Sequence, residues 1–82
     1  MTIAEVLQIA ESHIGKGAMV SSAKLALGDA KRLAEAGETE PALTRALMSL
    51  SYSVGVFHSD YTRILTLVRR AERAGRSGAV SG

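Results

Sequence analysis

Apolar residues recur at intervals of three and four along most of the chain, which is the spacing of one face of an α-helix. The pattern predicts helices near residues 3–14, 19–36, 41–57 and 60–74, and no strand. We therefore expect an all-α fold, a compact bundle of about four helices, with oligomerisation as one way to complete its core.

Local signals mark the ends of these helices. Thr2 and Glu5 have the spacing of a capping box, in which each side chain bonds a free amide of the first turn. Ser59 or Asp60 is predicted to cap the last helix. Gly75 is predicted to stop it, which leaves residues 1–75 as a single helical domain and residues 76–82 as a disordered tail.

The apolar faces of the two middle helices differ in character. The face predicted for residues 19–36 is mostly alanine, and small side chains let two helix axes approach closely, so we expect a tight neighbour there. The face of residues 41–57 runs without a break to Phe57 and has Leu47 and Leu50 at its centre. We predict that these two leucines lie in the core.

Composition narrows the class of protein. The chain has 82 residues and no cysteine, which excludes thiol catalysis, cysteine-based zinc sites and disulfide scaffolds. No stretch is apolar over the length that a membrane span needs, and the first residues lack the basic region of a signal peptide. We expect a cytoplasmic protein with no membrane partner.

The two histidines are the candidates for site chemistry. His13 and His58 are far apart in sequence, and His58, Ser59 and Asp60 are consecutive, so those three cannot form a catalytic triad unaided. We predict structural or exposed roles for both histidines. The sequence thus predicts no catalytic residue, no metal or other cofactor and no small-molecule substrate, and we expect the protein not to be an enzyme.

Several apolar residues lie outside the predicted inner faces. Tyr52 and Val56 share a second side of the helix predicted over residues 41–57, and Met48 also lies away from its inner face. A second apolar surface is typical of oligomers and of partner grooves, although a core that wraps more widely would also account for it. We favour a small interaction module, an accessory regulator or inhibitor that binds another protein or forms a homo-oligomer through these three residues.

The last predicted helix supports an alternative function. Arg63, Arg69, Arg70 and Arg73 fall on one side of residues 60–74, where arginine can pair with phosphates or guanine edges. The preceding segment, with Gly55 between apolar neighbours, resembles the turn and recognition helix of a DNA-binding helix-turn-helix. That resemblance implies a nucleic-acid-binding regulator, whereas an ordinary solvated arginine face would explain the same pattern.

Overall fold

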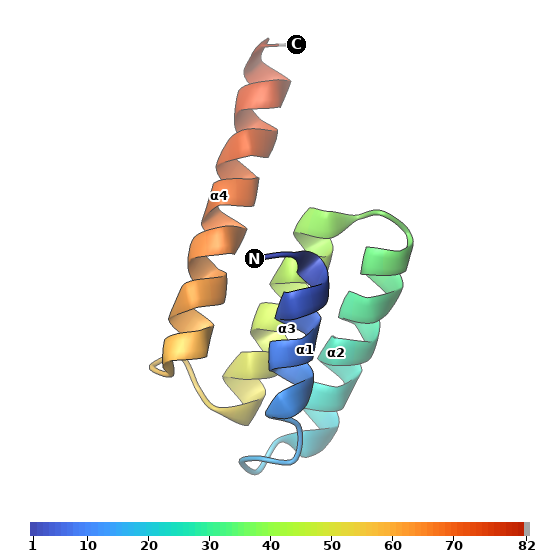
Figure 1. Ribbon diagram of the computed structural model, residues 1–82, viewed down its shortest axis with the longest axis vertical. Coiled ribbons are helices and arrows are strands. Elements are labelled where there is room, and N and C mark those ends of the chain that lie inside the picture. Colours follow the sequence, from blue (N-terminus) through green and yellow to red (C-terminus); the bar gives the residue numbers. More distant parts are fainter. Residues whose placement is uncertain (82) are drawn as a thin grey trace.

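In the computed structural model, the chain folds into helices α1 (Ile3–Ser12), α2 (Val20–Glu35), α3 (Thr39–Ser53) and α4 (Ser59–Ser81). The structure describes the backbone of residues 1–81 and the side chains of residues 1–75, and no strand occurs among them. Successive helices run in opposite directions, up and down the bundle (Figure 1). The predicted all-α bundle of about four helices is confirmed. None of the described helices combines the length and apolarity that crossing a membrane requires.

Helix α3 is the central element, because it packs against each of the other three helices. Leu50 is fully buried on α3, as are Val6 on α1 and Ile64 on α4. Leu47 is also buried, so the predicted core positions on the cleanest apolar face are confirmed.

Helices α2 and α3 meet through small side chains. Ala23 and Ala30 of α2 and Ala46 of α3 are completely buried. Ser49 of α3 is buried as well, and its hydroxyl donates to the carbonyl of Ala23 across the interface, with an O···O distance of 2.9 Å. The tight neighbour predicted for the alanine-rich face is therefore α3.

The end of α3 differs from the prediction. The helix stops at Ser53 instead of continuing to residue 57, and Gly55 adopts a positive φ of 84°. The amides of Val54 and Gly55 both donate to the carbonyl of Leu50, which closes the last turn. Phe57, predicted to be the last inward residue, is instead 97% exposed. The left-handed glycine ends the helix although the apolar spacing continues past it.

The end of α4 also differs. The helix was predicted to stop at Gly75, yet it runs to Ser81. Gly75 has an ordinary helical backbone there, and a glycine inside a helix costs only about 1 kcal/mol, so it does not by itself end one. The predicted disordered tail, residues 76–82, lies outside the residues whose side chains the structure describes, and its disorder stays a prediction.

Candidate functional site

Two loops meet at one end of the bundle, where α1 connects to α2 and α3 connects to α4 (Figure 1). The backbone of Gly17, in the first loop, lies against the last residues of α3. A β-carbon on Gly17 would stand 2.9 Å from the carbonyl oxygen of Ser53, and φ at Gly17 is +75°. This approach needs a glycine. It places the loop that follows α1 directly against the end of α3.

The packing of these loops brings the two histidines together. His13, the C-terminal cap of α1, is buried, and its Nε2 lies 2.8 Å from Oδ2 of Asp60. The rings of His13 and His58 meet edge to face, with centroids 4.9 Å apart. On the other side of the His13 ring, Nζ of Lys16 lies 2.9 Å from Nδ1. We refer to His13, His58 and Asp60 as the histidine cluster.

The hydrogen bonds determine the tautomer of His13. The Lys16 ammonium can only donate, so Nδ1 of His13 accepts, and a neutral ring then carries its proton on Nε2. That N–H donates to the carboxylate of Asp60. Both ring nitrogens of this buried side chain are therefore satisfied, which is what stable burial of a polar group requires.

His58 performs the capping role that was predicted for Ser59 or Asp60. Its Nδ1 accepts from the backbone amide of Asp60 at 3.1 Å, in the first turn of α4. An unprotonated ring nitrogen can serve in place of the usual side-chain oxygen, because a free amide at a helix start needs only an acceptor. Histidine is not among the common capping residues, so the sequence carries no clear signal for this cap.

Asp60 lies among donors and positive charge. The hydrogen bond from His13 holds the pKa of the Asp60 carboxyl below its ordinary value, and partial burial opposes that effect. The charge of Arg63, and those of the His13 and His58 rings once they are protonated, lower this pKa further. The Arg63 guanidinium stands 3.4 Å from Oδ1. Asp60 is therefore a carboxylate at neutral pH, and it can accept protons or ligate a cation.

The cluster combines two imidazoles and one carboxylate whose ligand atoms all lie within 4.8 Å of one another. Sequence reasoning predicted separate structural or exposed roles for the histidines, and no metal site. The one local signal was the spacing of His58 and Asp60, which places two ligand types on one turn. The third member lies 47 positions before Asp60, and only the packing of the two loops supplies it.

The second feature of this end is apolar and exposed. Phe57 is 97% exposed, and its neighbour Val56 is 48% exposed, in the loop between α3 and α4. Met19, in the other loop at this end, is 51% exposed. Together we call Val56 and Phe57 the apolar loop.

The three residues predicted to bind a partner do not form one helix face. Val56 lies beyond the end of α3, because Gly55 turns the chain before it. Tyr52 and Met48 remain on α3, where both are half-buried. Whether the three bind a partner stays a prediction, but the surface assumed for them was wrong in its geometry.

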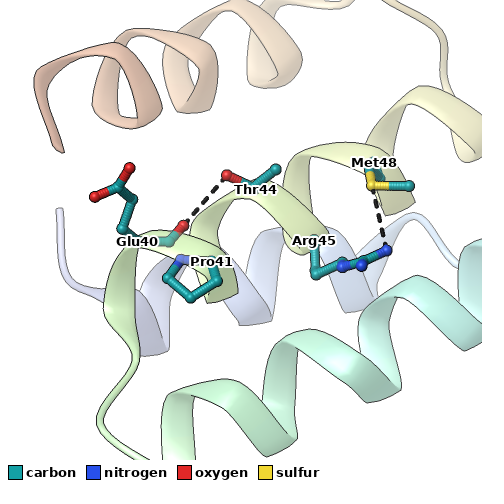
Figure 2. Close-up of a pocket in the computed structure, with 5 residues that line it drawn as sticks. All are labelled: Glu40, Pro41, Thr44, Arg45 and Met48. Atoms are coloured by element: carbon teal, nitrogen blue, oxygen red, sulfur yellow. Dashed lines mark hydrogen bonds between the residues drawn. The ribbon is translucent and has the colours of Figure 1, made fainter. Parts of the chain in front are cut away.

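Met48 instead lines a surface pocket at the other end of α3 (Figure 2). The remaining lining residues are Glu40, Pro41, Thr44 and Arg45. The Thr44 hydroxyl is engaged with the carbonyl of Glu40, and the Arg45 guanidinium points along the helix to the sulfur of Met48 (Figure 2). The Thr44 hydroxyl and the Arg45 guanidinium thus bond within α3, while the Glu40 carboxylate points away from both, so the polar groups in Figure 2 do not converge on a common point in the pocket.

The predicted arginine face is present on α4. Arg63, Arg69, Arg70 and Arg73 are exposed, while Ile64 and Val68 are buried against the bundle. The helix-turn-helix geometry is not present. Helices α3 and α4 run in opposite directions as a hairpin (Figure 1), whereas the two helices of that motif cross steeply. The nucleic-acid alternative therefore depends on the charge of α4 alone.

Comparison with known proteins gives no match of significance to this chain, whether among family models, curated proteins or solved structures.

Proposed function

We propose that this protein is a small, non-enzymatic interaction module that associates with a second copy of itself through the apolar loop. The observation that carries the proposal is the exposure of Phe57, which is the one phenylalanine of the chain and 97% accessible to solvent. An exposed large apolar side chain is ordinary when it stands alone, but here Val56 beside it is also half accessible.

The loop that presents Phe57 is anchored at both ends. Before it, Gly55 closes α3 through its hydrogen bond to Leu50. After it, the His58 ring caps α4, and the carbonyl of His58 accepts from the amide of Thr62. A loop held in this way loses little conformational freedom when it binds, so more of the free energy of burial appears as affinity.

A second copy is the partner that the chain itself supports best. In a two-fold symmetric contact the same patch serves both subunits, so one apolar loop is enough to build the interface. The chain is also small, and a domain of this size buries a limited share of its own surface on folding. Burial of Phe57 against its counterpart would add to that share.

The test compares two apolar-to-serine variants by sedimentation velocity over a wide range of protein concentration. Burial of one phenylalanine side chain is worth about 1.5–3 kcal/mol, and a symmetric dimer buries two. Phe57→Ser should therefore weaken dimerisation roughly 100-fold or more. The matched control is Leu25→Ser, because Leu25 is 69% exposed but lies on α2, outside the apolar loop.

Three results of the sedimentation experiment distinguish self-association through the apolar loop from its alternatives. A parent protein that dimerises, with Phe57→Ser monomeric and Leu25→Ser like the parent, supports the proposal. Equal weakening by both variants would indicate non-specific hydrophobic association and count against a defined interface. A parent that stays monomeric at every concentration would exclude the second copy as partner.

Nucleic-acid binding through α4 is the second candidate. Its support is the exposed row of arginines formed by Arg63, Arg69, Arg70 and Arg73, which includes one ion pair, between Arg63 and Asp60. Exposed arginines on one helix face can follow a phosphate backbone and release counterions from it.

A further inference from the structure

We propose that the histidine cluster is a binding site for a divalent transition-metal ion, with Zn²⁺ as the ion it fits best. The inference concerns a different set of side chains from the apolar loop, and it stands or falls independently of self-association. It begins from the juxtaposition of His13, His58 and Asp60, which the sequence separates and the two loops bring together.

The donor set selects the class of metal. Two imidazole nitrogens and one carboxylate oxygen suit borderline ions such as Zn²⁺, Co²⁺ and Ni²⁺, whereas Mg²⁺ and Ca²⁺ prefer oxygen ligands throughout. Three protein ligands leave one position of a tetrahedral Zn²⁺ for water. The solvent side of the cluster can supply that water, because His58 and Asp60 are only partly buried while His13 is buried.

The distances need small adjustments for a bound ion. With metal–ligand bonds of about 2.0–2.1 Å, neighbouring ligand atoms of a tetrahedral site lie about 3.3 Å apart. His13 Nε2 and Asp60 Oδ2 are slightly closer than this, at 2.8 Å, and the longest separation in the cluster is 4.8 Å or less. A rotation of the partly exposed His58 ring would shorten the longer separations. It would also take the Nδ1 of His58 away from the Asp60 amide, so the bond to the ion would replace that hydrogen bond at the start of α4.

Some of the groups around the histidine cluster favour a bound cation, and others oppose it. His13 caps the C-terminal end of α1, where the partial negative charge of the helix favours a cation, and the Asp60 carboxylate is ionised. The charges of Lys16 and Arg63 oppose a metal ion. Both of those side chains are exposed, so each can swing into solvent when an ion enters.

Metal binding would also change the tautomer of His13. In the structure Nε2 carries the proton that bonds Asp60, and Nδ1 accepts from Lys16. An ion on Nε2 replaces that proton, which passes to solvent, while Nδ1 takes up a proton once Lys16 has left it. The ring stays neutral and the net proton count is unchanged. Lys16 therefore competes with the ion, and its removal should strengthen binding.

The experiment titrates the protein with Zn²⁺ by isothermal calorimetry and with Co²⁺ by visible absorption. We expect one ion per chain and, for Co²⁺, the intense d–d bands of a four-coordinate site. Asp60→Asn keeps an acceptor for the His13 bond, and His58→Gln keeps an acceptor for the cap of α4. Each variant should bind Zn²⁺ at least about tenfold more weakly, since even residues that only support a ligand contribute 10–100-fold to metal affinity.

Two controls and one reverse variant complete the design. Asp29→Asn removes a half-exposed carboxylate of α2, and Lys24→Gln removes an exposed ammonium of the same helix. Both should leave the affinity at the level of the parent. Lys16→Gln should tighten Zn²⁺ binding, an effect that a merely structural role for the cluster would not produce. Circular dichroism of each variant checks that the helices are intact.

Each outcome of the titrations either supports the metal site or overturns it. Saturable binding that is lost in Asp60→Asn and His58→Gln and strengthened in Lys16→Gln supports the site. No saturable Zn²⁺ binding below ~1 mM would overturn it. So would equal affinity in the parent, Asp60→Asn and His58→Gln, because the ion would then reside elsewhere. A stoichiometry of one ion per two chains would replace the intrachain site with one shared between copies.

Discussion

His13 receives a polar partner on each ring nitrogen, although it is buried where the end of α1 meets the start of α4. The other described side chains are likewise satisfied, because none of their buried nitrogen or oxygen atoms lacks a hydrogen bond. An unpaired buried polar atom would cost about 1–3 kcal/mol, a large share of the stability of a small domain. The histidine cluster thus contributes to the fold as well as offering ligands.

At the scale of single residues, we expect the free energy of unfolding to fall at acid pH because of Asp60. Its folded-state pKa is lowered by the His13 hydrogen bond, by the charge of Arg63, and by the charges of the His13 and His58 rings once they are protonated. The stabilisation is therefore complete above the unfolded-state pKa of about 3.9 and is lost as the pH falls through the lower folded-state value. The free energy of unfolding, measured by urea denaturation, should fall more steeply between pH 5 and about 2 in the parent than in Asp60→Asn.

Asp29→Asn is the control for that measurement. Asp29 pairs with Arg32 on the exposed surface of α2, and such pairs are worth little. Its pH profile should follow the parent. The same slope in Asp60→Asn as in the parent would mean that the cluster does not account for the acid sensitivity.

At the scale of elements, the position of α3 explains most of the packing. Its Ser49 bonds the backbone of α2, and its leucines share one core cluster with residues of α1, α2 and α4. Small residues on one side and large ones on the other let a single helix contact three neighbours. The stability of the domain should therefore depend strongly on α3.

We expect Leu50→Ala to lower the free energy of unfolding by roughly 2–5 kcal/mol, because Leu50 is fully buried and the loss of its side chain leaves a cavity. Thermal denaturation followed by circular dichroism should show a melting temperature lower by about 10 °C or more. Leu25→Ala makes the same change at a position that is 69% exposed, and should alter stability by no more than about 0.5 kcal/mol. Similar melting temperatures for both variants would show that α3 is not the centre of the core.

At the scale of the whole molecule, α4 packs mainly against α3 and extends past the other helices (Figure 1). It starts at the end of the bundle that carries the histidine cluster and diverges from α3 as it rises, with its last turns beyond the other helices (Figure 1). Arg69, Arg70 and Arg73 are exposed on this helix. Because these arginines are exposed and α4 extends past the other helices, a large partner can reach the arginine face.

Duplex DNA provides the test of that face. We expect weak, salt-sensitive binding by the parent, measured by fluorescence anisotropy at several salt concentrations. The double variant Arg69→Gln with Arg70→Gln should reduce the slope of log Kobs against log salt by about 1.8, since each lost phosphate contact contributes about 0.9. Lys24→Gln with Lys31→Gln, on α2, removes the same charge elsewhere and should change the slope much less.

The DNA-binding measurement, read together with the sedimentation of Phe57→Ser, distinguishes the two proposed functions. If the parent binds DNA tightly at physiological salt and the arginine variant abolishes binding, while Phe57→Ser sediments like the parent, the nucleic-acid function should replace self-association. Tight binding that Lys24→Gln with Lys31→Gln weakens equally would show a non-specific effect of net charge.

Much of this architecture follows from short-range patterns that the sequence displays by itself. Apolar spacing of three and four determined the four helices, and the leucines of residues 41–57 identified the core. The Thr2 capping box formed as predicted, because its two hydrogen bonds join residues three apart. These features depend on neighbours within one or two turns, so the sequence alone determines them.

Only the tertiary structure decided the rest. The apolar spacing continues through Gly55, but the hydrogen bonds at Leu50 end α3 there and expose Phe57. The spacing of apolar residues says where a helix can form, whereas the end of a helix depends on which turn the surrounding packing favours. The histidine cluster is a long-range contact between residues 47 positions apart, formed at the end of the bundle where the loop containing Gly17 approaches α3. Whether residues so far apart in the sequence meet depends jointly on helix lengths, loop paths and packing. No local sequence pattern predicts it.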